Sequence, residues 1–153
     1  MTELWGADEV HELEHHIDGW LASIRTEIPQ ILAVDRGDED EVRWYVRLRG
    51  EEKDFTTIWL TLRQRTLRYE TYVMPAPEEN QAALFEHLLR RNERLVGAHF
   101  SIGIEDAVFL RGELPLRLVD EAELDRVIGT LFGIVEQTFQ GLLRIGFASR
   151  FAR

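Results

Sequence analysis

The stretch TIWLTLRQRTLRYETYVMPAP, residues 57–77, decides the fold because it contains two β-strands that fold back on each other. In the first strand Ile58 and Leu60 alternate with Trp59 and Thr61, which is the period of a strand with one buried face. The two strands agree in phase when three pairs face each other across a four-residue turn: Leu62 with Leu67, Leu60 with Tyr69, and Ile58 with Thr71.

Trp59 and Tyr72 fall on the other face of this hairpin, diagonally across it. Large exposed aromatic side chains on a sheet mark a partner-binding surface or a dimer contact. The alternative is that the N-terminal helix or the C-terminal tail covers them, since aromatic residues also dominate cores. We therefore predict Trp59 and Tyr72 as candidate residues of a partner-binding or dimer surface, with cover by the chain itself as the open alternative.

The strand that precedes this hairpin is residues 42–49, where apolar and polar positions alternate strictly. Trp44 and its alternate neighbours face the core, while Arg43, Tyr45, Arg47 and Arg49 face the opposite side. A polar turn at residues 50–54 joins it to the next strand. Residues 30–41, which contain a run of four acidic residues, are predicted to be a connection without a strand.

The remaining segments predict three helices and two further strands. Helical spacing of apolar residues covers residues 8–28 and 78–95, and a third helix begins with a capping pattern at Asp120 and Glu123. Two short strands are predicted at residues 99–104 and 107–111, with Gly112 at the end of the second. The expected order is α-β-β-β-α-β-β-α, a mainly antiparallel α+β fold in one domain, residues 1–153.

Composition narrows the class of protein. The chain has 153 residues, a net charge of -10 and no cysteine, which excludes disulfides and thiolate metal sites. The N-terminal residues do not read as a signal peptide, and no segment has the ~20 apolar residues of a membrane span. We expect a cytoplasmic protein that binds neither nucleic acid nor membranes, because its acidic surface repels both.

One short motif suggests a metal. His11-Glu12-Leu13-Glu14-His15 matches H-E-x-x-H, in which two histidines one helical turn apart bind zinc. On this helix, however, His11 and His15 lie far from the apolar stripe, so the pair is predicted on the solvated acidic side. No third ligand motif follows, and no preceding strand could bind a substrate. A chance match is favoured, and a metallohydrolase using His11, Glu12 and His15 is kept as an alternative.

The other chemical signatures are missing from the sequence. There is no phosphate-binding glycine loop, no G-x-S-x-G serine, and no predictable partner for His87 or His99. We therefore predict no catalytic, cofactor-binding or metal-binding residues, and a protein that is not an enzyme. A regulator that senses a small molecule in a cleft between the second or third helix and the sheet is a further alternative.

Several longer segments resemble actinobacterial YbjN-domain proteins. The resemblance covers most of the chain from about Trp59 onward. It is carried by YETYVMPAPEENQAALFEHLLRRN at residues 69–92, FSIGIEDAVFLRGELPL at 100–116, DEAELDRVIG at 120–129 and RIGFASRF at 144–151.

The YbjN family is in turn similar in fold to type III secretion chaperones. The resemblance implies their α+β fold, a homodimer, and a surface that binds extended segments of client proteins. It also implies a regulatory role, because the family is described as regulators of sensory transduction. We expect a chaperone-like, adaptor or regulatory protein with a protein or peptide client, and the resemblance supplies no catalytic residues.

Overall fold

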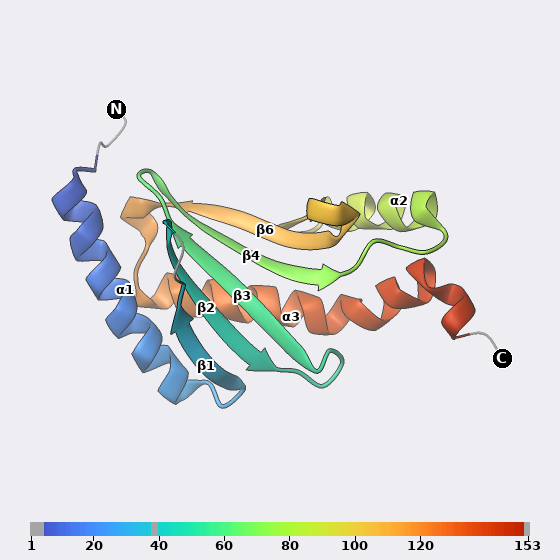
Figure 1. The fold of residues 1–153 in the computed structure, drawn as a ribbon, viewed down its shortest axis with the longest axis horizontal. Coiled ribbons are helices and arrows are strands. Elements are labelled where there is room, and N and C mark those ends of the chain that lie inside the picture. Colours follow the sequence, from blue (N-terminus) through green and yellow to red (C-terminus); the bar gives the residue numbers. More distant parts are fainter. Residues whose placement is uncertain (1–4, 38–39, 152–153) are drawn as a thin grey trace.

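The computed structural model describes residues 5–37 and 40–151, and in these residues six strands form one antiparallel sheet. The strand order across the sheet is β1-β2-β3-β4-β6-β5 (Figure 1). The strands are β1 (Ile31–Arg36), β2 (Val42–Arg49), β3 (Phe55–Leu62), β4 (Thr66–Met74), β5 (His99–Ile102) and β6 (Val108–Pro115). The predicted α+β, mainly antiparallel fold is confirmed.

The helices cover one face of the sheet. They are α1 (Ala7–Glu27), α2 (Gln81–Asn92) and α3 (Glu121–Gly146). α3 packs against β3 and β4 and also against α1 and α2, so all three lie on the same side, and in Figure 1 the strands pass in front of α3. α1 buries the apolar stripe expected from its sequence: Leu13, Ile17, Leu21 and Ile24.

The predicted hairpin register is confirmed. β3 and β4 pair Leu62 with Leu67, Leu60 with Tyr69 and Ile58 with Thr71, and all six side chains are buried. The alternation of β2 is also confirmed, because Trp44, Val46 and Leu48 are buried, whereas their neighbours along the strand are more exposed. The sheet therefore has an inner face under the helices and an outer face on the other side.

One strand was missed by sequence reasoning. Residues 30–41 were expected to be a connection, but Ile31–Arg36 form β1, which makes the order α-β-β-β-β-α-β-β-α. A register shift between Ile31 and Ala33, where β1 pairs with β2, breaks the alternation that would mark a strand. β1 is also an edge strand with two polar residues at its end, so only Ile31 is buried.

Several element ends differ from prediction: α2 covers Gln81–Asn92 instead of residues 78–95, and β5 ends at Ile102 instead of at residue 104. α1 begins after Gly6 without a side-chain cap, so Asp8 is not the capping residue. β6 continues through Gly112 to Pro115 instead of ending at the glycine. The predicted cap of α3 is confirmed, because the Asp120 carboxylate accepts a hydrogen bond from the Glu123 backbone N–H at 2.8 Å.

Thr56 is an unsatisfied polar residue in the core. Its side chain is fully buried on β3 opposite Leu48, and among the described residues its hydroxyl has no hydrogen-bond partner. We expect Thr56→Val, which keeps the shape and removes the hydroxyl, to raise the free energy of unfolding by about 1 kcal/mol. Urea unfolding measures this, with Thr71→Val as the control, because the Thr71 hydroxyl donates to the Thr57 carbonyl at 2.7 Å and its loss should destabilise.

Glu136 of α3 forms hydrogen bonds with the turn between β2 and β3 and so joins this turn to the helix layer. Its carboxylate accepts hydrogen bonds from the backbone N–H groups of Glu51 at 2.6 Å and Lys53 at 3.1 Å. Burial lowers the pKa of the Lys53 ammonium, and the negative charge of Glu136 opposes that shift. The turn is thus held by an acceptor from a distant part of the chain.

We expect Glu136→Ala to lower the free energy of unfolding by about 1–2 kcal/mol, because it leaves these N–H groups without their charged acceptor. Urea unfolding followed by circular dichroism measures the loss. Gln137→Ala, the exposed neighbour on the same helix, is the control and should change stability little. Equal effects of the two substitutions would contradict this role of Glu136.

Candidate binding surface

The outer face is the side of the sheet opposite the helices. Strand registers place its members on alternate positions of β2, β3, β4 and β6. Of the described residues, no α-helix lies over these strands on the side that faces the viewer in Figure 1. Its charged and aromatic members on these strands are Arg43, Tyr45, Arg47, Arg49, Phe55, Trp59, Arg68, Glu70, Tyr72, Phe109, Arg111 and Glu113.

Trp59 is half-buried on the outer face, at the centre of the sheet. Its ring meets Tyr45 edge to face, with centroids 6.1 Å apart and planes at 85°. The Arg43 guanidinium carbon lies 5.6 Å from the centroid of the indole ring. Arg43 is held there because its Nε donates to the Thr61 hydroxyl at 2.9 Å. The cover of Trp59 therefore comes from side chains of the sheet itself.

Tyr72 is 38% exposed and has a separate aromatic neighbour. Its ring meets Phe109 of β6 edge to face at 5.7 Å, and the Lys53 ammonium lies 5.7 Å from the ring centroid. Burial, and secondarily the negative charge of Glu105, raises the pKa of the Tyr72 hydroxyl. Trp59 and Tyr72 thus both lie on the outer face, as predicted, but each belongs to its own aromatic pair.

Arginine side chains lie over the other rings of this face. The Arg47 and Arg49 guanidinium carbons are 4.4 Å and 6.0 Å from the Phe55 ring centroid, and that of Arg111 is 4.4 Å from Phe109. Such cation–π contacts hold a flexible guanidinium in a defined place. Alternation along the sequence predicts that Arg47 and Arg49 share a face of the strand with Tyr45. It does not identify Phe55 and Phe109 as the rings that these arginines and Arg111 contact.

Glu70 is the buried carboxylate of the outer face, with a residue exposure of 8%. It accepts from Arg111 Nε at 2.8 Å and forms an ion pair with Arg68 at 3.3 Å. Two cations around one carboxylate leave a local excess of positive charge. The sequence alone does not predict this cluster of Glu70, Arg68 and Arg111, because Arg111 lies next to β4 only through the pairing of β4 with the distant strand β6.

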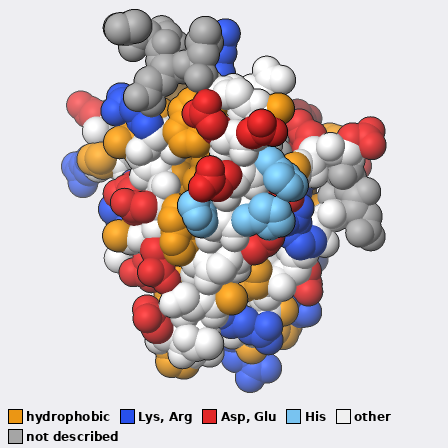
Figure 2. Space-filling view, turned by 90° about the vertical axis from the view of Figure 1, so that its left-hand side faces the viewer, with side chains coloured by type: hydrophobic (Ala, Val, Ile, Leu, Met, Phe, Trp, Pro, Cys, Tyr) orange, Lys and Arg blue, Asp and Glu red, His pale blue; other side chains and the backbone are white. Residues whose placement is uncertain are grey.

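The H-E-x-x-H helix lies where its spacing predicts, on the exposed side of α1. His11 and His15 are exposed, and their Nε2 atoms are 3.2 Å apart. Figure 2 shows histidine side chains on the open surface of this side of the molecule, with acidic side chains around them. Within residues 5–37 and 40–151, no group of three His, Asp or Glu side chains could hold a metal ion.

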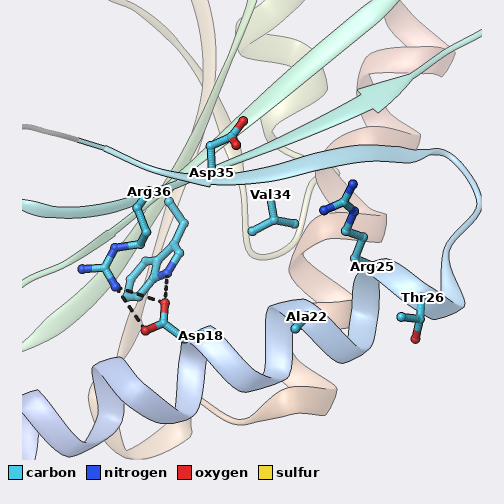
Figure 3. Close-up of a pocket in the computed structure, with 8 residues that line it drawn as sticks. Asp18, Ala22, Arg25, Thr26, Val34, Asp35 and Arg36 are labelled. Carbon is cyan, nitrogen blue, oxygen red and sulfur yellow. Dashed lines mark hydrogen bonds and ion pairs between the residues drawn. The ribbon is translucent and has the colours of Figure 1, made fainter.

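A hollow of about 580 Å³ lies between α1 and the strands β1 and β2, not between the sheet and α2 or α3 (Figure 3). Its central polar groups bind each other: the Asp18 carboxylate accepts from the Trp44 indole at 2.7 Å and from Arg36 at 3.0 Å. Asp35 points away from the hollow toward the outer face. The hollow therefore offers a small molecule few free polar groups.

Within the part of the chain that the structure describes, no helix is long and apolar enough to cross a membrane.

The chain was compared with known protein families and with curated proteins. The YbjN family, described as "Putative bacterial sensory transduction regulator", matches residues 15–144. Uncharacterized proteins of Mycobacterium tuberculosis and Mycobacterium bovis are 35% identical to this chain over 108 residues, which is 71% of this chain. An uncharacterized protein of Mycobacterium leprae is 33% identical over the same length. The aligned region spans 59% of the length of these relatives.

Proposed function

The chain belongs to the YbjN family, and on that premise we propose that it is a regulatory protein that binds a protein or peptide partner through the outer face, without catalysis. The observation that carries the proposal is the open outer face itself. It combines the two aromatic pairs, around Trp59 and Tyr72, with ordered arginines. Tyrosine, tryptophan and arginine are the residues enriched in protein interfaces and in their binding hot spots.

The outer face is better suited to a different protein than to a second copy of this chain. A twofold dimer brings the same patch of both subunits together. In such a dimer two copies of a face with five arginines and three carboxylates would meet, and the excess of like charge opposes their association. A homodimer, which the chaperone resemblance implies, would then form through another surface and leave the outer face to the partner.

The test is affinity capture with crosslinking from a mycobacterial lysate, with retained proteins identified by mass spectrometry. A Trp59→Ala/Tyr72→Ala variant should lose a reproducible partner that the wild-type protein retains. Both rings are partly exposed, so circular dichroism should show an intact fold. A His11→Ala/His15→Ala variant on the far side of α1 is the matched control and should retain the partner.

Two results would overturn the proposal. One is an identical set of retained proteins for the outer-face variant and the wild type. The other is a partner lost only in the His11→Ala/His15→Ala variant, which would move the binding site to α1. Sedimentation of the purified chain reports separately whether it forms a dimer.

A further inference from the structure

The outer face is positively charged on an acidic protein. The whole chain carries a net charge of -10, yet five arginines point outward from β2, β4 and β6. Three carboxylates point outward from the strands of the same face: Asp35, Glu70 and Glu113. The sheet thus separates charge, because the excess of acidic residues lies elsewhere on the molecule.

Arg47 and Arg49 are the arginines of this face with free hydrogen-bonding edges. Both are exposed, and among the described residues no carboxylate forms an ion pair with either. Their guanidinium groups lie over Phe55, which fixes them against the sheet. Arginine stacked on a ring presents its planar N–H edge outward, and this edge binds carboxylates through two hydrogen bonds.

The covered rings argue against single-stranded nucleic acid as the ligand. Nucleic-acid-binding sheets present open aromatic faces on which bases stack. Here cations lie over the rings: Arg43 over Trp59, Lys53 over Tyr72, and Arg111 over Phe109. A carboxylate needs only free guanidinium edges, which Arg47 and Arg49 provide.

Resting on the proposed function, we infer that the outer face binds an extended acidic segment of a partner protein, with Arg47 and Arg49 as its anchors. The two arginines are two residues apart on β2, so their attachment points are separated by about 6.6–7 Å. Carboxylates at alternate positions of an extended peptide have the same spacing. The ligand class is therefore a segment with Asp or Glu at every second residue.

The experiment is fluorescence anisotropy with a labelled twelve-residue peptide that alternates Glu and Thr. We expect saturable binding that weakens as salt rises from about 0.05 to 0.5 M, because exposed charges are screened. An Arg47→Glu/Arg49→Glu variant should weaken binding at least about tenfold. The matched control, Arg90→Glu/Arg94→Glu, makes the same change in net charge at exposed arginines on and just beyond α2, and should bind as the wild type does.

Three outcomes would overturn the inference: equal binding of the peptide with Gln in place of Glu, equal loss in both charge-reversal variants, or tighter binding of a twelve-residue oligodeoxythymidine that depends on Arg47 and Arg49. The capture experiment separates this inference from the proposed function. If the Arg47→Glu/Arg49→Glu variant keeps a partner that the Trp59→Ala/Tyr72→Ala variant loses, the outer face binds a protein but not an acidic one.

Discussion

Replacing Trp44 with alanine is expected to lower the free energy of unfolding by about 3–5 kcal/mol. The Trp44 side chain is 1% exposed and lies on the inner face of β2, opposite Leu60. Its indole N–H donates to the Asp18 carboxylate of α1 at 2.7 Å, and Arg36 lies 4.8 Å from its ring centroid. The substitution removes the largest fully buried side chain of the sheet. It also removes the hydrogen bond that joins β2 to α1.

Urea unfolding followed by far-ultraviolet circular dichroism measures this loss. Trp44→Phe is the informative control, because it keeps an aromatic ring and removes only the hydrogen bond and part of the volume. It should cost clearly less than the alanine substitution. If Trp44→Ala lowers the free energy of unfolding by less than about 1 kcal/mol, the contact between Trp44 and α1 contributes little to the stability of the core.

The strands with one fully buried face were predictable from sequence. In β2, β3 and β4 the helices cover one side only, so the side-chain period of two appears directly in the residue types. Matching the two phases of residues 57–77 was then enough to give the register from Ile58–Thr71 to Leu62–Leu67. A slip of one residue would place the apolar set on the outer face, which is why the register is so strongly determined.

β1 could not be predicted in the same way. It lies at the sheet edge and is bulged near Ile31. It ends in Asp35, which is exposed, and Arg36, which forms an ion pair with Asp18 of α1. A strand of this kind carries no clear alternation, because it is neither fully buried on one face nor regular in its pairing.

The outer face was only partly predictable, for a different reason. Trp59 and Tyr72 follow from alternation within one hairpin. Their aromatic neighbours come from other strands: Tyr72 meets Phe109 because β6 pairs with β4 across a long connection that includes α2. Pairing between distant strands produces no periodic pattern in the sequence. The arrangement of charged and aromatic side chains on the outer face is therefore known only from the structure.

Gly112 is expected to be the most sensitive glycine of the sheet, and Gly112→Ala should lower the free energy of unfolding by about 3 kcal/mol. It lies within β6 directly opposite Tyr69 of β4. A Cβ at this position would collide with the Tyr69 ring and with the Gly97 carbonyl oxygen. The ring has little freedom to move, because the Tyr69 hydroxyl donates to that same carbonyl. The glycine therefore makes room for a buried tyrosine and does not end a strand.

The controls for Gly112 are two exposed glycines of α3, Gly129 and Gly141, where an added Cβ would meet nothing within 4 Å. Gly→Ala in a helix interior without steric conflict should stabilise by about 0.5–1 kcal/mol, because alanine loses less conformational freedom on folding. The same substitution should thus have opposite signs at Gly112 and at Gly141 in urea unfolding. A stabilising or neutral Gly112→Ala would mean that β4 and β6 separate readily, and the outer face that these strands help to form would then not be a rigid binding surface.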